Sequence, residues 1–233
     1  MTRARSTRPS PRGALVAALL ASLAGGARAD DVSAEAVPPP IALGIEAGGG
    51  PVIHLAGGED YAAAKLRVSP FVRYGWAHLG AASELDTPTW SLSRDASWLG
   101  PGETRVTRWQ YVLTSTLGAS FPERTLGEGW LGRHLRLELL GETGMIYTRL
   151  EEELDAGGVG DRSLVRWTPF AGARLGLRMR FGRPWAGFFG LAAFYRHPFD
   201  DERFRRANGR REPFAGDTVG VVVFGGADVT VRR

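Results

Sequence analysis

The chain has 233 residues, of which 29 are lysine or arginine, 25 are aspartate or glutamate and none is cysteine. Disulfide bonds are therefore excluded, so an exported chain of this size must be held together by its core or by closure of its sheet. Five arginines and no acidic residue lie within residues 1–29, which leaves 24 basic and 25 acidic side chains in the rest. The basic net charge is thus no argument for binding nucleic acid, and we expect no nucleic acid partner.

The first 29 residues differ from everything that follows. Four arginines in "MTRARSTRPSPR" precede the uncharged stretch "GALVAALLASLAGG", and "ARA" stands directly before Asp30. This order of a basic region, a short apolar region and a small-residue cleavage site is typical of a secretory signal peptide, and the apolar stretch is too short for a spanning helix. We predict cleavage after Ala29, a flexible Pro-rich leader over 30–40, and a single domain over 41–233.

Beyond residue 40, polar and apolar residues alternate with a period of two, which indicates strands with one polar and one apolar face. We predict eight strands, at 41–49, 65–74, 77–86, 105–121, 133–149, 163–181, 184–197 and 217–232. Pro70 is a weak point of the second strand, because proline cannot donate a hydrogen bond to a neighbouring strand. The boundary at Gly75–Trp76 separates the second strand from the third.

The connections between these strands alternate in length. Short or intermediate segments follow the second, fourth and sixth strands, and long polar segments follow the first, third, fifth and seventh, at 50–64, 87–104, 150–162 and 198–216. In an up-and-down arrangement all long loops then lie at one end, and both termini lie at the other. An even number of strands with short turns at one end and long loops at the other is the layout of transmembrane barrels.

Aromatic residues stand at both ends of the apolar face of the predicted strands. Tyr111 and Phe121, and likewise Trp185 and Tyr195, are ten residues apart, which is about the length that a tilted strand needs to cross a bilayer. Two such belts predict a lipid-facing band. The belt near the long loops comprises Trp109, Tyr111, Tyr147, Trp167 and Tyr195, and the belt near the short turns comprises Tyr74, Trp76, Phe121, Phe181 and Trp185.

The opposite face of the strands carries charges of both signs and many glycines. If the apolar face meets lipid, these charges fill the interior, because an eight-stranded barrel is only wide enough for its own side chains. The predicted interior network is Glu46, Arg67, Arg73, Glu84, Arg108, Arg136, Glu138, Glu142, Arg174, Arg178 and Asp228. We expect the glycines to make room for the arginines. Pairing Tyr147 with Trp167 sets the register of the fifth and sixth strands, and it predicts that Arg174 lies between Glu138 and Glu142.

In strand alternation, aromatic belts and loop order, the chain resembles the small eight-stranded outer-membrane barrels of the outer membrane protein A transmembrane-domain type. The resemblance covers residues 41–233 and implies an all-β, antiparallel up-and-down barrel with a filled polar interior. It also implies a monomer in the outer membrane that the outer-membrane assembly machinery inserts. Such proteins commonly end in an aromatic residue, whereas this chain ends in Val231, Arg232 and Arg233.

Three classes of function are compatible with such a barrel. A non-enzymatic protein would act in membrane integrity, surface contact or ligand binding through its outer loops. Guanidinium groups bind phosphate oxygens, so the arginines of the last long loop are candidate contacts to outer-membrane lipid and lipopolysaccharide. These candidates are Arg203, Arg205, Arg206, Arg210 and Arg211.

The second class is a lipid-modifying enzyme, such as a lipid A deacylase. His197 and Ser163 are the candidate catalytic residues, because strand alternation places both on the lipid-facing side near the outer end of the barrel. No acidic partner is evident, and catalysis needs a base and its orienting group together. The third class is a narrow passive channel, which a lumen filled by arginines disfavours. We find no metal-binding spacing, phosphate loop or dinucleotide fingerprint, and we predict no cofactor and no metal.

Overall fold

The protein is described by a computed structural model that gives residues 41–55, 61–87, 90–91, 104–121, 134–154, 162–181, 186–200, 202–205 and 211–231. Residues 39–233 form one compact unit, and the structural account below concerns this unit. The predicted signal peptide and leader lie outside the described residues. No helix in the described part of the chain is long and apolar enough to cross a membrane.

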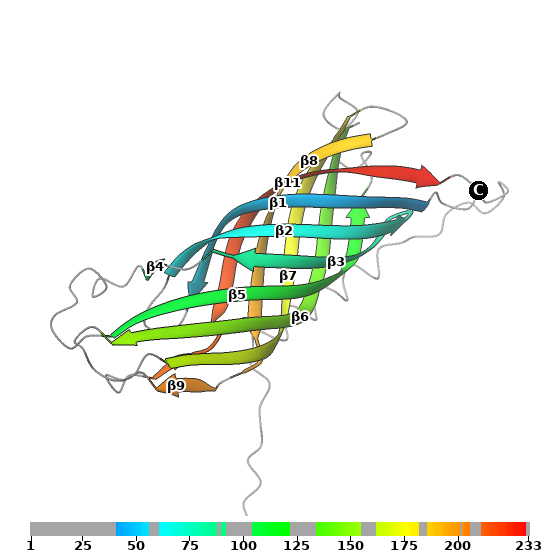
Figure 1. The fold of residues 1–233 in the computed structure, drawn as a ribbon. Coiled ribbons are helices and arrows are strands. Elements are labelled where there is room, and N and C mark those ends of the chain that lie inside the picture. Colours follow the sequence, from blue (N-terminus) through cyan, green and yellow to red (C-terminus); the bar gives the residue numbers. More distant parts are fainter. Residues whose placement is uncertain are drawn as a thin grey trace, which may run out of the picture. The chain divides into compact units, whose positions relative to one another are not determined.

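Eight long antiparallel strands form a closed barrel in which each is hydrogen-bonded to its neighbour in the chain (Figure 1). They are β1 (Ile41–Leu55), β2 (Tyr61–Tyr74), β3 (Ala77–Asp86), β5 (Thr104–Phe121), β6 (Leu135–Leu154), β7 (Arg162–Phe181), β8 (Ala186–Pro198) and β11 (Asp217–Val231). Pairing of β1 with both β2 and β11 closes the sheet, with Ile41 opposite Val231 and Tyr74. The predicted all-β, eight-stranded up-and-down barrel is therefore confirmed.

Three short strands lie outside this set of eight. One is β4 (Trp90–Ser91), which extends the edge of β2, and the others are β9 (Arg203–Arg205) and β10 (Arg211–Pro213), which pair with each other in the connection from β8 to β11. The end of the barrel at which β1, β3, β6 and β8 terminate is called the loop end. The other end, where β2 turns into β3, is the turn end.

The strands at the loop end are longer than predicted. Much of the expected loop 50–64 is strand, because β1 continues to Leu55 and β2 begins at Tyr61. Likewise β6 and β7 continue past the expected boundaries at 150–162. Glycine and charge at these positions suggested loops, but pairing with a neighbouring long strand satisfies their backbone groups and extends the ladder.

The structure confirms both predictions about β2, namely the boundary at Gly75–Trp76 and the weak point at Pro70. Gly75 has a φ of 60°, a conformation that favours glycine, and it forms the tight turn that places Tyr74 opposite Ala77. Pro70 lies within β2 and faces Ile45 of β1. On its other side the ladder to β3 is interrupted between the Val68–Ser83 and Phe71–Gly80 pairs, because proline has no N–H to donate.

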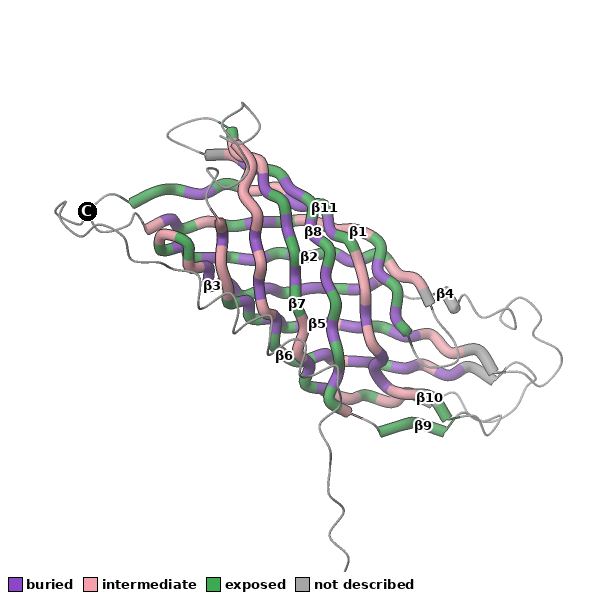
Figure 2. Tube along the Cα trace, turned by 180° about the vertical axis from the view of Figure 1, so that it is seen from behind, coloured by how far each residue is buried: buried purple, intermediate pink, exposed green. Residues whose placement is uncertain are grey.

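Side chains alternate between the lumen and the outer surface along every long strand, as the bands of Figure 2 show. The outer face is apolar, and the side chain of Leu117, for example, is 67% exposed. Such an exposed apolar surface is far larger than soluble proteins tolerate and is typical of a lipid-facing band. The exposed aromatic residues at the two ends of this band include Tyr74, Trp76, Trp109, Trp167, Phe181 and Tyr195.

The remaining residues of the two predicted belts are less exposed or not described. Tyr111, Phe121 and Tyr147 are half-buried on the outer face, and the rings of Tyr147 and Trp167 lie 5.1 Å apart across β6 and β7. Trp185 lies outside the described residues.

Phenylalanines as well as arginines face the inward glycines. Each of five inward phenylalanines faces a glycine on the neighbouring strand, in the pairs Phe71–Gly44, Phe170–Gly144, Phe188–Gly226, Phe194–Gly220 and Phe224–Gly190. A Cβ at Gly44 would lie 2.3 Å from Cζ of Phe71, whereas a Cβ at Gly172 would lie 3.0 Å from Cγ of Arg196, so the inward glycines make room for phenyl rings as well as for the expected arginines. Counting inward charges overlooked these rings, because phenylalanines also stand on the outer face.

Candidate functional site

The centre of the lumen holds a dense network of ion pairs. Arg196 bridges two carboxylates, with Nη1 2.6 Å from Glu84 Oε2 and Nε 2.8 Å from Glu142 Oε2. Arg67 contacts Glu84 at 2.6 Å and Glu142 at 3.2 Å. These side chains come from β2, β3, β6 and β8, so they meet across the lumen. All four side chains are almost completely buried, and a buried charge without an oppositely charged partner is strongly destabilising.

The network continues toward the turn end through Glu46. Its carboxylate accepts hydrogen bonds from Arg174 at 2.7 Å and Arg178 at 2.9 Å. Arg178 also lies 3.0 Å from Glu138. Each of these arginines stacks on a phenyl ring, and the guanidinium of Arg178 is 4.0 Å from the ring centre of Phe188.

The predicted partners of Arg174 are wrong, although the predicted register is right. Tyr147 faces Trp167 and Glu138 faces Gly176, as expected. Arg174 nevertheless reaches across the lumen to Glu46 on β1, while Arg178 binds Glu138 and Arg196 binds Glu142. In a closed eight-stranded barrel, the opposite wall is within reach of an arginine, so adjacency on one wall does not decide the pairing.

A second group of buried polar residues lies nearer the loop end, and the sequence prediction missed it. Lys65 is 2.6 Å from Asp86 and 2.9 Å from Glu84. Asp86 also contacts His54, whose other ring nitrogen is 3.1 Å from the hydroxyl of Thr218. All of these side chains point into the lumen from β1, β2, β3 or β11. The strand alternation that placed Glu46 in the interior therefore also indicated their position.

The turn end of the lumen has a cluster of its own. Asp228 of β11 forms ion pairs with Arg73 of β2 and Arg180 of β7, one through each carboxylate oxygen. Arg136 of β6, also predicted for the interior, is half-buried and lies opposite Arg178. Among the three paired residues, two guanidinium groups share the one carboxylate of Asp228.

The connection between β8 and β11 covers the loop end of the lumen. Phe204 of β9 and Phe214 are buried against Leu150 of β6, and Ala215 packs with Val112, Ile146 and Phe170 inside the barrel. Arg108, which was predicted for the interior, is buried and donates a hydrogen bond to the carbonyl of Pro213 at 3.1 Å. This inserted segment, residues 213–216, is called the cap below.

Ion pairs on the rim hold the same connection in place. Arg166 of β7 pairs with Asp200 and Glu202, and its guanidinium lies 5.5 Å from the ring centre of Phe214. The hydrogen bond from Arg166 keeps the pKa of Asp200 below its usual value of 3.8. Asp200 thus stays ionised and attached to Arg166 at neutral pH.

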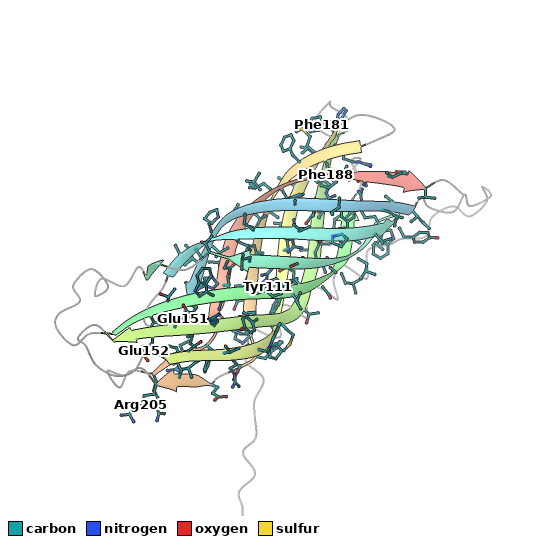
Figure 3. The ribbon with its side chains drawn as sticks, viewed as in Figure 1. Tyr111, Glu151, Glu152, Phe181, Phe188 and Arg205 are labelled. Atoms are coloured by element: carbon teal, nitrogen blue, oxygen red, sulfur yellow. The ribbon has the colours of Figure 1, made fainter. Side chains whose placement is uncertain are left out.

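Arginines gather on the exposed side of the β9–β10 hairpin. Arg205 lies directly opposite Arg211 in the pairing of the two strands, and Arg203 lies two residues further along β9, opposite Pro213. All three arginines are exposed, whereas Phe204 between them is buried. In Figure 3, Arg205 points away from the barrel near the loop end. Arg206 and Arg210 lie outside the described residues.

The two candidate catalytic residues do not meet. His197 of β8 faces Ala171 of β7, and Ser163 lies eight positions from Ala171, or about 26 Å at roughly 3.3 Å per residue. The expected similar height of the pair is therefore wrong, because the shear of the barrel displaces neighbouring strands. His197 does have an acidic partner, with Nδ1 2.6 Å from Asp217 Oδ1. No group of three or more potential metal ligands occurs among the described residues.

Comparison with known proteins finds likeness in structure and not in sequence. No protein-family model and no curated protein matches the chain. Among solved structures, Neisserial surface protein A superimposes with a TM-score of 0.50 at 10% identity, over 82% of this chain and 99% of its own. The chain has the fold of the small outer-membrane barrels. The resemblance drawn from the sequence is thereby confirmed at the level of fold.

Two further structures match less well. A major outer membrane protein from Thermus thermophilus gives a TM-score of 0.38 at 11% identity, over 82% of this chain and 99% of its own. The outer membrane protease OmpT from Escherichia coli gives a TM-score of 0.30 at 12% identity, over 87% of this chain and 99% of its own.

Proposed function

We propose that the chain is a non-enzymatic outer-membrane protein whose β9–β10 hairpin binds the phosphate groups of lipopolysaccharide. In this proposal the loop end faces the outside of the cell and the turn end faces the periplasm. The observation that carries it is the arrangement of Arg203, Arg205 and Arg211 on one exposed face of a hairpin. Guanidinium groups bind phosphate oxygens in a bidentate manner.

The register of the hairpin supports an anionic ligand. Like charges directly opposite each other destabilise a pair of strands, and Arg205 stands directly opposite Arg211. A phosphate placed between the two guanidinium groups would be attracted by both. The cost of holding the arginines together is met by the burial of Phe204 and Phe214 on the other face.

The height of the hairpin above the membrane also suits lipopolysaccharide. Phe204 packs on Leu150, which lies three residues beyond the belt residue Tyr147 on β6, or about 10 Å along the strand. Headgroups extend roughly 5–8 Å beyond each side of the hydrocarbon core. At a strand tilt of roughly 40°, this distance along the strand is about 8 Å along the membrane normal, which would bring the arginines to the level of the phosphates of outer-leaflet lipid.

The alternatives have less support. For a lipid hydrolase, His197 and Asp217 provide a base and its orienting acid, but Ser163 is too far away to serve as the nucleophile. For a passive channel, the ion pairs and phenyl rings at the centre of the lumen leave little space for ions to pass, and the cap covers the loop end. A monomer remains our expectation, because closure of the sheet leaves no long strand edge for a second chain among the described strands.

Binding of fluorescent lipid A to the protein refolded in detergent micelles tests the proposal. The parent should bind phosphorylated lipid A in a saturable manner and should bind dephosphorylated lipid A at least tenfold more weakly. The double variant Arg205→Gln/Arg211→Gln should lose most of this preference. Arg149→Gln is a matched control, because Arg149 is exposed near the same end but lies on β6 and outside the hairpin. Equal binding of both lipids by the parent would refute a phosphate site.

A further inference from the structure

The turn end of the lumen carries an excess of positive charge that the centre of the lumen does not. In the centre, Lys65 and four arginines stand among five carboxylates, and the charges balance. At the turn end, Arg73 and Arg180 share the single carboxylate of Asp228, with one oxygen for each guanidinium. Arg73, Arg180 and Asp228 together therefore carry one net positive charge.

The guanidinium groups also have unused donors. Arg73 is 2% exposed, and its Nε and Nη1 have no hydrogen-bond partner among the described residues. The same holds for Nε of Arg180. A buried donor without an acceptor is costly, so an added acceptor for these N–H groups would stabilise the folded state.

The two arginines are held in fixed positions. Arg73 lies on β2, Asp228 on β11 and Arg180 on β7, so each is separated from the next by one strand and they meet only inside the barrel. The guanidinium of Arg73 lies 5.4 Å from the ring centre of Phe71, which restricts its orientation. A site that is fixed before the ligand arrives loses little conformational entropy on binding.

The cluster is within reach of solvent from the turn end. The Arg180 side chain is 20% exposed, while Asp228 is fully buried. Both arginines lie at the level of the turn-end belt, since Arg73 directly precedes Tyr74 and Arg180 directly precedes Phe181. The labelled Phe181 marks this end in Figure 3, opposite to Arg205.

We propose that the turn-end lumen binds a small oxyanion, a phosphate or a carboxylate, between Arg73 and Arg180. Its oxygens would accept hydrogen bonds from the free N–H groups of both arginines and neutralise the excess charge. Planar guanidinium donors match such oxygens better than they match a spherical ion such as chloride. This site is separate from the hairpin at the loop end, and neither depends on the other.

Urea unfolding of the protein refolded in phosphatidylcholine vesicles tests the site. Gel mobility gives the unfolding midpoint in increasing concentrations of sodium phosphate, sodium acetate or sodium chloride at matched ionic strength. A ligand that binds only the folded state raises the midpoint in a saturable manner, whereas a general salt effect grows without saturation. We expect a saturable rise with phosphate or acetate in the parent and none with chloride. The anion that saturates identifies the class of oxyanion.

Variants assign that rise to the cluster. Arg180→Gln should abolish the saturable rise, and so should Arg73→Gln; the partly exposed Arg180 is the safer of the two, because its replacement disturbs the barrel less. The control Arg149→Gln removes an arginine that Glu151 already neutralises, and it should retain the full rise. The proposal is wrong if no anion gives a saturable rise in the parent, or if Arg180→Gln retains it.

Discussion

Phe224 of β11 lies directly opposite Gly190 of β8, and a Cβ on residue 190 would be 2.4 Å from Cζ of the phenyl ring. The same relationship recurs four more times in the lumen. The ring of Phe224 in turn supports Arg174, whose guanidinium is 4.7 Å from its centre. The glycine thus leaves room for the phenyl ring, and the ring packs against the guanidinium group. The positions of the ion pairs therefore depend on the glycines.

Gly190→Ala should destabilise the barrel by about 1–3 kcal/mol, because the new methyl group collides with both Phe224 and the carbonyl of Leu177. Gly187→Ala on the same strand is the control, since nothing lies within 4 Å of its added Cβ. We expect that variant to change stability by about 0.5 kcal/mol or less. Urea unfolding in lipid vesicles compares the two, and equal midpoints would contradict the layered packing.

Arg196→Ala should lower the free energy of unfolding by about 3–5 kcal/mol, because it leaves Glu84 and Glu142 with less compensating charge in a buried network. Arg205→Ala at the exposed hairpin should cost about 0.5 kcal/mol or less. The same unfolding assay measures both. If the two variants unfold at the parent's urea concentration, the interior network does not stabilise the fold.

The refolded protein should show no stable conductance steps in planar lipid bilayers. The reason is that buried ion pairs and phenyl rings occupy the lumen and the cap covers its loop end. Arg108→Ala, which removes the hydrogen bond to Pro213, should leave the lumen closed because the side chains below the cap remain. Large, steady steps in the parent would show that the interior opens.

Attachment of the β8–β11 connection should depend on pH only in acid. The pKa of Asp200 is lowered by its hydrogen bond from Arg166, so the folded state releases the Asp200 proton more readily than the unfolded state. The resulting stabilisation is complete above the ordinary value of 3.8 and is lost as the pH falls through the lowered pKa. Acid therefore weakens the attachment, and alkali does not.

Hydrogen exchange of the Phe204 and Phe214 amides, corrected for the intrinsic rate, follows this attachment from about pH 6 to about pH 2.5. Protection should stay constant down to about pH 4 and then decrease. Asp200→Asn should show lower protection at pH 6 and no further step in acid. A parent whose protection falls between pH 6 and pH 5 would contradict the assignment to Asp200.

Strand alternation made the fold predictable from the sequence, because a period of two with an apolar outer face and belts ten residues apart suits very few structures. The inward position of Glu46, Arg67 and Arg178 followed from the same parity. The register of β6 and β7 also followed, since a hairpin pair such as Tyr147 and Trp167 sets every other pair.

Contacts across the lumen were decided only by the tertiary structure. The partner of Arg174 is on β1, 128 positions away in the chain, and the cap that meets Arg108 comes from a loop 105 positions away. The height of His197 relative to Ser163 depended on the shear of the barrel. The alternation of residues along a strand determines whether a side chain faces the lumen or the lipid. Closure of the sheet determines which distant side chains meet in the narrow interior.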